Sequence, residues 1–386
     1  MKIAVYGGSF NPPHKGHAKA AMDVIAWLKP DKILIIPTAS PPHKDFDEGS
    51  PASGHRLEMA KLFAKSIPQA EICEIEINRG GKSYTVDTIE ELCGLYPESE
   101  FYLMVGTDML LTFDKWRRFK RILDLVTVVG FIRKMGEEDE VCKYAEYLRK
   151  EYSGNILLLE RESLEISSTE IRIFLKNREG SDFLPDAVYS YIIKNRLYEA
   201  KPELKWLREK SYAYHSQDRI PHIAGTEQEA VRLAERWSVD TGMAAEAAIL
   251  HDITKKLTTQ EQLLLCNKYG IISDGLEKGS HKLFHSITGA ALAREEFGID
   301  DAVYDAIMYH TTGRPNMTKL EKIIYIADYI EPTRDFEGLD LLRKLAFEDL
   351  DKAMLLGLKM SLEEIEGRGQ VPHRRSVDAL EFFLNS

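Results

Sequence analysis

The sequence is poor in cysteine: only four of its 386 residues are cysteines, namely Cys73, Cys93, Cys142 and Cys266. No two of them form a Cys-x-x-Cys pair, which argues against a disulfide framework and against a zinc site built from thiolates. We therefore expect reduced thiols and a cytoplasmic protein.

Long apolar runs are also missing. No stretch approaches the roughly 20 apolar residues of a membrane-spanning helix, and the first residues lack the pattern of a secretory signal. Basic residues are not in surplus either, because the formal net charge is −11 and acidic residues outnumber basic ones on both sides of residue 200. A membrane partner and a non-specific nucleic-acid surface are therefore not expected, and the sequence leaves the oligomeric state open.

The length favours two domains, and the first half has the pattern of an α/β domain. Short apolar runs alternate there with helical patterns, which predicts βαβ units and a parallel sheet. Strands are expected at residues 2–7, 31–37, 71–77, 100–106, 125–132 and 155–160. Helices are expected at residues 17–28, 54–66, 85–96, 169–177 and 186–198.

From Leu197 onward the pattern changes, because nearly every segment is helix-like. Helices are expected at residues 227–237, 242–257, 287–297, 302–310 and 319–330. A linker around Pro202 separates the two patterns. We therefore predict an α/β domain at residues 1–199 and an all-α domain at residues 200–386.

The string GGSFNPPHKGH, residues 7–17, follows the first predicted strand. Its glycines allow a sharp turn close to a ligand, and a loop of backbone amides that ends at a helix N-terminus attracts phosphate. His14 and His17 lie about one turn apart and can point to the same side. The string matches neither G-x-G-x-x-G nor the Walker A pattern, which argues against a dinucleotide-binding or kinase-type loop. A second phosphate-binding candidate is ISSTEIR, residues 166–172, whose Ser167 and Glu170 form a capping box.

Together the two strings resemble the (H/T)xGH and ISSTxxR signatures of the nucleotidyltransferase superfamily, in the form found in bacterial nicotinate-nucleotide adenylyltransferases. The resemblance covers about residues 1–199 and implies a Rossmann-like fold. It also implies transfer of AMP from ATP, with Mg²⁺ held mainly by the phosphates, to nicotinate mononucleotide, giving deamido-NAD and pyrophosphate. Pantetheine-phosphate and nicotinamide-nucleotide adenylyl transfer are the alternatives within the superfamily, and SYTVDT, GTD and Trp116 favour nicotinate.

The same resemblance implies the residues of the site. The catalytic candidates are His14, His17, Lys44 and Arg172. The ATP-binding candidates are Gly7, Gly8, Ser9, Phe10, His14, His17, Ser167, Ser168, Thr169 and Arg172. The nicotinate-nucleotide candidates are Lys44, Tyr84, Thr85, Asp87, Gly106, Asp108, Trp116 and Arg133. By itself, Trp116 would more often be a core residue and Asp108 a helix cap.

The second half carries a set of polar residues on or beside apolar helices: His222, His251, Asp252, His285, His310 and Asp328. Buried polar groups of this kind are costly unless they have partners. Mixed imidazole and carboxylate ligands suit iron, manganese or zinc better than calcium. The set therefore predicts a metal centre.

The order H…HD…H…H…D, with HDITK, YHTTGR and YIADYIEPTR, resembles the HD superfamily of metal phosphohydrolases, and within it the YqeK-type symmetrical bis(5′-nucleosyl)-tetraphosphatases. This implies an HD-domain helical bundle that hydrolyses diadenosine tetraphosphate to two ADP with metal-activated water. One metal ion would be bound by His222, His251, Asp252 and Asp328, and a second by Asp252, His285 and His310. Iron is expected, with manganese as the alternative. Asp252 and Lys255 would be catalytic, and Lys255, Thr311 and Arg314 would bind the polyphosphate.

Three alternatives remain open for this half. Spacing alone does not choose between His281 and His285 as the ligand, and we choose His285 because SITGAALAREEFG follows it. His215 and His281 are then expected to be structural. The all-α half could also hydrolyse another nucleotide, or it could be a nucleotide-sensing regulatory module.

Overall fold

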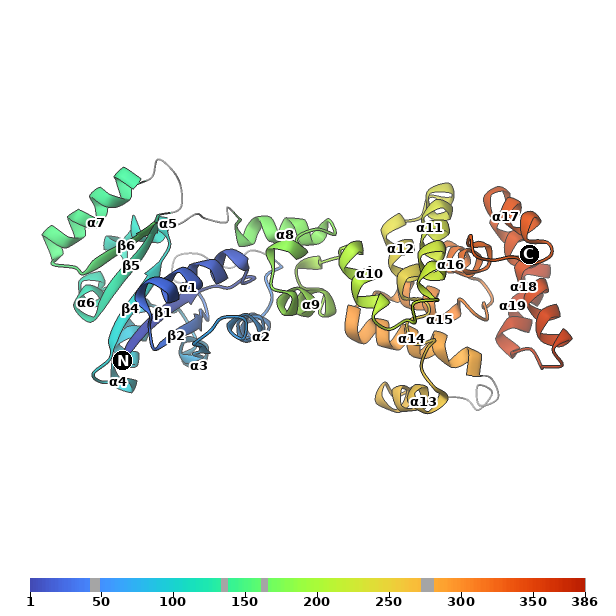
Figure 1. Ribbon diagram of the computed structural model, residues 1–386, viewed down its shortest axis with the longest axis horizontal. Coiled ribbons are helices and arrows are strands. Elements are labelled where there is room, and N and C mark those ends of the chain that lie inside the picture. The colour runs from blue at the N-terminus through green and yellow to red at the C-terminus, as the bar shows by residue number, and fades with distance from the viewer. Residues whose placement is uncertain (42–48, 133–137, 161–165, 272–280, 386) are drawn as a thin grey trace. The chain divides into compact units, whose positions relative to one another are not determined.

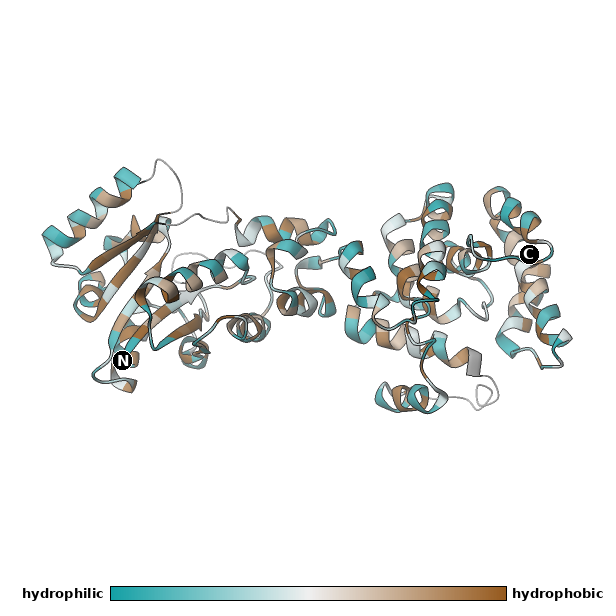
Figure 2. Ribbon diagram, in the orientation of Figure 1, coloured by the Kyte–Doolittle hydropathy of each residue, from teal (hydrophilic) through white to brown (hydrophobic). Residues whose placement is uncertain are grey.

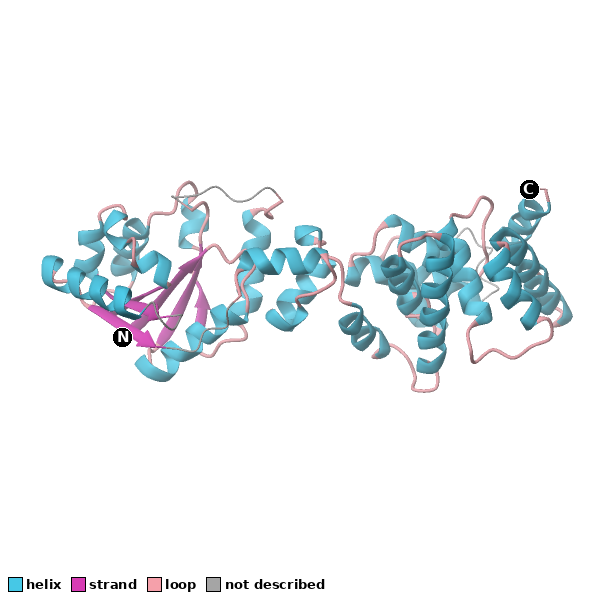
Figure 3. Cartoon of the chain, turned by 90° about the horizontal axis from the view of Figure 1, so that it is seen from above, coloured by secondary structure: helices cyan, strands magenta, loops and turns pink. Residues whose placement is uncertain are grey.

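The computed structural model describes residues 1–41, 49–132, 138–160, 166–271 and 281–385. It divides the chain into two compact units, Met1–Lys201 and Pro202–Ser386. Within the described residues, all strands lie in the first unit and the second unit is entirely helical (Figure 3). The predicted fold class, an α/β domain with a parallel sheet followed by an all-α domain, is confirmed.

The first unit alternates strands and helices along the chain (Figure 1). Its strands are β1 (Lys2–Gly8), β2 (Lys32–Pro37), β3 (Ala70–Ile72), β4 (Glu100–Val105), β5 (Val126–Ile132) and β6 (Ile156–Glu160). Its helices are α1 (Lys15–Leu28), α2 (Ser53–Ala64), α3 (Ile75–Arg79), α4 (Thr85–Leu95), α5 (Thr107–Leu110), α6 (Phe119–Leu125), α7 (Glu138–Tyr152), α8 (Ser168–Lys176) and α9 (Asp186–Lys194). Short 3-10 helices lie at Phe113–Lys115, Ser181–Phe183 and Leu197–Glu199.

All six strands are parallel and lie in the order β3-β2-β1-β4-β5-β6. This is a doubly wound sheet, in which the chain direction across the sheet reverses between β1 and β4. Val5 of β1 lies opposite Leu103 of β4, so the two strands end at the same edge. In such sheets, ligands bind beyond the carboxyl ends of the strands where the order reverses.

The sheet is buried on both faces, as expected for parallel strands covered by crossover helices. Ile3 and Val5 of β1 pack in a core with apolar side chains of α4, α6 and α7. The alternate residues, among them Ala4, Ile33 and Ile35, are fully buried as well. Figure 2 shows the strands as a continuous hydrophobic layer, in contrast to the more hydrophilic α7. The near-continuous apolar runs of the sequence follow from this two-sided burial.

One predicted strand is largely wrong. Residues 71–77 were expected as a strand, but β3 ends at Ile72 and helix α3 begins at Ile75. Ile75 and Glu76, the first two residues of this short helix, are both buried. Thr88 of α4 donates to Oε1 of the buried Glu76 carboxylate at 2.8 Å, so one oxygen of this acid has a partner on the next helix. Helices α5, α6 and α7 were not predicted.

A buried arginine of α2 joins the loops that follow β1 and β2. Arg56 is 1% exposed, and its guanidinium donates to the carbonyl oxygens of Thr38 at 2.6 Å, Ala39 at 2.9 Å and Ser9 at 3.2 Å. Ser9 lies in the GGSFNPPHKGH loop. Arg56 therefore fixes that loop against its neighbour at the ligand-binding edge of the sheet.

The second unit contains only helices among its described residues. They are α10 (Leu204–Tyr212), α11 (Ile220–Trp237), α12 (Thr241–Leu250), α13 (Thr259–Lys268), α14 (His281–Phe297), α15 (Asp301–Tyr309), α16 (Lys319–Ile330), α17 (Leu339–Glu348), α18 (Leu350–Gly367) and α19 (Arg374–Leu384). Helix α11 packs against α12 and α16, and α15 packs against α12, α14 and α16. In the described part of the chain, none of the helices combines the length and the apolar composition that crossing a bilayer requires.

The helix expected at residues 242–257 is shorter than predicted. Helix α12 ends at Leu250, and the residues that follow form turns. The imidazole of His251 bonds through Nδ1 to the carbonyl oxygen of Ala248 at 2.7 Å. A side chain thus takes one of the carbonyls that a helix end leaves unpaired.

We predict that Arg56→Met destabilises the first unit by about 3 kcal/mol or more, because three loop carbonyls lose their donor in a buried setting. Urea unfolding of the full chain, monitored by hydrogen exchange of the backbone amides in β1 and β2, measures the free energy of unfolding of the first unit. Lys61→Met on the same helix is the control, since the Lys61 ion pairs are partly exposed and such pairs contribute little. Equal stability of the two variants would contradict the role given to Arg56.

Candidate active sites

The first candidate site lies where β1 and β4 end. Gly7 and Gly8 form the end of β1, and Gly106 is the N-cap of α5 directly after β4. The loop after β1 leads into α1, whose N-cap is His14. Backbone amides at a helix N-terminus attract anions, so this edge of the sheet can receive phosphate.

The two histidines of the opening string lie side by side. The ring centroids of His14 and His17 are 3.7 Å apart, and His17 accepts a hydrogen bond from the His14 backbone amide at Nδ1 (3.2 Å). Behind them, the buried ring of Phe10 lies 5.4 Å from the His17 ring. The two imidazoles therefore lie together at the start of α1, as their spacing in the sequence predicted.

The second string meets the first in space, although more than 150 residues separate them. Ser168 donates from its hydroxyl to the carbonyl oxygen of Pro12 at 3.0 Å, and Arg172 donates to that of Asn11 at 3.0 Å. The capping box predicted for Ser167 and Glu170 is confirmed at the start of α8. Arg172 thus reaches the loop that carries His14.

The nicotinate-nucleotide candidates are divided over three segments. Tyr84 and Thr85 begin α4, and the guanidinium of Arg117 lies 4.4 Å from the centre of the Tyr84 ring. Asp108 is exposed in the first turn of α5, and Trp116 is half-buried against the ring of Phe113. Asp87 pairs with Arg117 at 3.7 Å. Lys44 and Arg133 lie outside the described residues.

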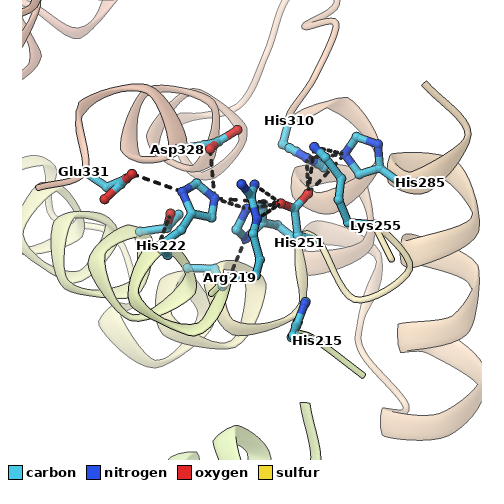
Figure 4. Close-up of polar contacts among 12 residues, drawn as sticks. His215, Arg219, His222, His251, Lys255, His285, His310, Asp328 and Glu331 are labelled. Atoms are coloured by element: carbon cyan, nitrogen blue, oxygen red, sulfur yellow. Dashed lines mark hydrogen bonds and ion pairs between the residues drawn. The ribbon is translucent and has the colours of Figure 1, made fainter. Parts of the chain in front are cut away.

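The second candidate site is a cluster in the centre of the helical unit, shown in Figure 4. His222 comes from α11, His251 and Asp252 follow α12, and His285 lies on α14. The cluster is completed by His310, directly after α15, and by Asp328 of α16. All six predicted metal ligands are buried. Five separate helix regions thus bring them to one place.

Asp252 divides the cluster into two sides. Its Oδ2 lies 3.5 Å from Nε2 of His251 and 3.7 Å from Nε2 of His222. Its Oδ1 lies 3.1 Å from Nε2 of His285 and 3.5 Å from Nε2 of His310. One carboxylate therefore presents a separate oxygen to each pair of histidines, as a ligand shared by two metal ions would.

The donor set fits metal cations. Nδ1 of His251 and Nδ1 of His310 bond to carbonyl oxygens, of Ala248 at 2.7 Å and of Ile307 at 2.6 Å. In neutral rings, these bonds place the proton on Nδ1 and the lone pair on Nε2. Nε2 of His222 lies 3.3 Å from Nε2 of His251 and 3.2 Å from Oδ1 of Asp328.

Electron-rich atoms that converge in this way repel one another unless a cation lies between them. Ligand atoms of His222, His251 and Asp328 lie within 4.8 Å of one another, and so do those of His251, Asp252 and His310. The predicted metal centre is therefore supported by the chemistry and spacing of these groups.

Burial shifts the protonation equilibria of the cluster. It lowers the pKa of His251 to about 3 and that of His285 to about 4. Burial alone would raise the pKa of Asp252, but the interactions with His251, His285, His310 and Lys255 outweigh it and hold this pKa well below its ordinary value. His251 and His285 are thus neutral and Asp252 is ionised near pH 7, the forms that bind metals.

The polyphosphate candidates have different surroundings. Lys255 contacts the cluster, with Nζ 3.1 Å from Nε2 of His285 and 3.3 Å from Oδ1 of Asp252. The hydroxyl of Thr311 has no hydrogen-bond partner in the described part of the chain. Arg314 instead donates to Glu321 at 2.6 and 2.9 Å and to Asp305 at 2.9 Å.

Three charged residues of this site were not singled out from the sequence. Arg219 donates to Oδ2 of Asp252, Arg334 donates to Oδ1 of Asp328, and Glu331 bonds to Nδ1 of His222. Arg219 precedes His222 by three residues, and Glu331 follows Asp328 by three. A search for charged residues one helical turn from each proposed ligand would have found these two.

His215 and His281 were expected to be structural. His215 is buried, and its Nε2 lies 3.4 Å from the Ser211 hydroxyl. In Figure 4 it lies apart from His222, His285 and His310. His281 is the first residue of α14.

Comparison with known proteins gives matches in both units. Residues 5–174 match the cytidylyltransferase-like family model, and residues 219–333 match the HD domain model. A Mycoplasma genitalium protein named "Probable nicotinate-nucleotide adenylyltransferase/Ap4A hydrolase" is 30% identical over 366 residues, which cover 93% of this chain and 97% of that protein.

Two further matches each cover one half. A Carboxydothermus hydrogenoformans protein named "Probable nicotinate-nucleotide adenylyltransferase" is 35% identical over 198 residues, 51% of this chain and 98% of that protein. The solved structure of a "predicted HD superfamily hydrolase involved in NAD metabolism" from Clostridium acetobutylicum is 37% identical. It covers 47% of this chain and 96% of that chain, with a TM-score of 0.46.

We predict that the metal-free protein loses stability in the second unit as the pH falls from 7 to 4. The folded-state pKa values of His251 and His285 lie below the unfolded value of about 6.5. The unfolded chain therefore binds more protons in this range, and each histidine removes up to about 1.4 kcal/mol per pH unit.

Hydrogen exchange of the chelator-treated full chain, read in α12 and α14, measures this loss. His285→Asn should reduce the slope with pH, whereas His373→Asn, at the N-cap of α19, should leave it unchanged. A wild-type slope of zero between pH 6 and 4 would contradict the prediction.

Proposed function

The chain belongs to the family of bifunctional nicotinate-nucleotide adenylyltransferase/Ap4A hydrolases, and from this premise we propose which residues of each unit carry the two reactions. The first unit transfers AMP from ATP to nicotinate mononucleotide, giving deamido-NAD and pyrophosphate. The second hydrolyses diadenosine tetraphosphate (Ap4A) to two ADP. The observation that carries the proposal is that the two polar sites lie in separate compact units, each with its own complement of charged groups.

In the first unit, His14, His17 and Arg172 neutralise the triphosphate of ATP. The loop from Gly7 to Phe10 and the start of α8 supply backbone amides and hydroxyls to the phosphates. The phosphate oxygen of nicotinate mononucleotide attacks the α-phosphorus in line, and pyrophosphate leaves. Positioning and neutralisation of the developing charge are sufficient, so no covalent enzyme intermediate is required. Mg²⁺ bound to the phosphates and Lys44 complete the proposed set.

The acid form of the pyridine substrate would be selected at the start of α4. The first amides of a helix favour a carboxylate over a neutral amide, and Thr85 is the first residue of this helix. Ser83, two residues earlier, accepts from the Ala39 amide and donates its own amide to the Ser40 carbonyl. These bonds fix the segment beside the loop after β2. Trp116 is the proposed stacking partner of the pyridine ring.

In the second unit, His222, His251, Asp252 and Asp328 would hold one metal ion, and Asp252, His285 and His310 a second. When bound, such ions lower the pKa of water and polarise phosphate oxygens. Iron is the proposed metal, with manganese as the alternative. Lys255, whose Nζ lies beside Asp252 and His285, would neutralise the phosphate at which the reaction occurs. Thr311 and Arg314 are proposed for the more distant phosphates.

We predict that His17→Ala and Asp252→Asn separate the two activities. His17→Ala should reduce adenylyl transfer at least 100-fold, the usual effect of losing a group that stabilises developing charge, and should leave hydrolysis of Ap4A unchanged. Asp252→Asn should abolish hydrolysis and leave transfer unchanged. Assays of deamido-NAD and ADP formation by the metal-loaded full chain measure both.

The matched control for Asp252→Asn is Asp301→Asn, because the Asp301 side chain lies in the same unit and is 96% exposed. Full transfer by His17→Ala would refute the role of His17. A wild-type protein that releases phosphate from mononucleotides but no ADP from Ap4A would overturn the proposed substrate of the second unit.

We also predict that Arg172→Lys lowers adenylyl transfer about 10- to 100-fold. Lysine keeps the positive charge but lacks the two terminal nitrogens with which the Arg172 guanidinium donates to both Asn11 and Thr169. Steady-state kinetics on ATP test this prediction, with Arg178→Lys as the control beyond the end of α8. A kcat/KM for ATP equal to that of the wild type would contradict it.

A further inference from the structure

The turn that follows α16, residues 330–334 (IEPTR), contacts the metal-ligand cluster from one side. Glu331 is fully buried, and its Oε1 lies 3.1 Å from Nδ1 of His222. Arg334 donates to Asp328 twice, from Nη2 to Oδ1 at 2.5 Å and from Nε to the backbone carbonyl at 2.9 Å. Figure 4 shows Glu331 on the far side of His222 from Lys255 and His285. One short turn thus supports two of the proposed ligands.

The Glu331 carboxylate is itself fixed by the turn. Thr333 donates to it from its hydroxyl at 2.5 Å and from its backbone amide at 2.7 Å. The Arg334 amide donates to the Glu331 carbonyl at 3.0 Å. Glu331 therefore has little freedom to move away from His222, as a positioning group requires.

Helix α11 is shaped to accept this turn. A Cβ on Gly225, one helical turn after His222, would lie 2.8 Å from Oε2 of Glu331 and 3.0 Å from Cδ of Pro332. Gly225 has helical geometry, so its glycine is needed for space and not for backbone conformation. The close approach of the turn to α11 depends on the absence of this side chain.

A carboxylate on Nδ1 has two effects on His222. It keeps the proton on Nδ1, so that Nε2 presents its lone pair toward Asp328 and His251, and it makes the ring a stronger donor. The other anchored histidines, His251 and His310, have backbone carbonyls in this position. His222 is thus the histidine whose electron density the protein raises most.

Within the described residues, no contact of this turn with His285 or His310, on the other side of the cluster, is observed. His285 and His310 contact Asp252, Lys255 and each other. The support is therefore asymmetric, although Asp252 is shared by both sides.

We propose that Glu331, supported by Gly225 and Thr333, is a positioning residue that sets the affinity of the His222/Asp328 side for its metal ion, while the His285/His310 side is independent of it. The inference rests on the two-metal centre of the proposed function, and it does not depend on which substrate that centre hydrolyses. Glu331 is not one of the proposed metal ligands and acts through the His222 imidazole. Outer carboxylates of this kind contribute about 10- to 100-fold to metal affinity.

Two variants of the full chain test the proposal in different ways. Glu331→Gln removes the charge and keeps the shape. Gly225→Ala keeps the charge and displaces the carboxylate, while alanine favours the helix. Mn²⁺ titration of the metal-free protein, with the free ion followed by electron paramagnetic resonance, reports each binding step. We expect both variants to bind one Mn²⁺ as tightly as the wild type and the other about 10- to 100-fold more weakly.

Two control variants accompany them. Glu229→Gln changes a buried acid of the same helix that pairs with Arg232, and Gly367→Ala adds a Cβ that meets nothing within 4 Å. Both should titrate like the wild type.

The proposal would be overturned if Glu331→Gln and Gly225→Ala bind both Mn²⁺ ions with wild-type affinity. It would also be overturned if these variants weaken the two binding steps equally. A wild-type protein that binds two Mn²⁺ ions but releases no ADP from Ap4A would overturn the proposed hydrolysis and leave this inference intact.

Discussion

The second unit is organised around one buried negative charge. The side chain of Asp252 is fully buried, and an ionised carboxylate in such a place is strongly destabilising unless it has partners. Here Arg219, Lys255 and four imidazoles face its two oxygens. Because these groups come from several helices, the helices must converge at this point. The same helix packing therefore supplies the partners that the buried Asp252 charge needs and brings together the ligands of the proposed metal centre.

In both units the proposed functional side chains lie at helix ends. His14 is the N-cap of α1, and His251 and His310 are the C-caps of α12 and α15. A helix end leaves backbone groups unpaired. At the C-termini, those carbonyls orient the imidazoles. At the N-terminus of α1, the free amides are the proposed partners of phosphate. The two proposed sites thus draw on opposite ends of helices, since one uses terminal amides and the other uses terminal carbonyls that orient imidazoles.

The two units differ in how their sites are assembled. In the first, the order of the parallel strands brings the loops after β1 and β4 to one edge of the sheet, and α8 then contacts the first loop through Ser168 and Arg172. In the second, no sheet is present among the described residues, and the site depends on the mutual packing of α11, α12, α14, α15 and α16. The first site is therefore assembled by the order of the strands. The second is assembled by helices that pack around the buried Asp252 charge.

The sequence alone determined the fold classes, five of the six strands, and the pairing of His14 with His17 and of Ser167 with Glu170, because these depend on local periodicity and on residues within one helical turn. It also singled out the six proposed metal ligands, Asp252 and the five residues that cluster around it.

Only the tertiary structure showed that residues 75–79 are helical, since the burial of Glu76 depends on Thr88, and that α12 ends at Leu250. Only the tertiary structure, likewise, assigned one oxygen of Asp252 to each pair of histidines and placed Glu331 against His222. Contacts between residues 30 to 110 positions apart are set by helix packing, and no local pattern in the chain encodes them.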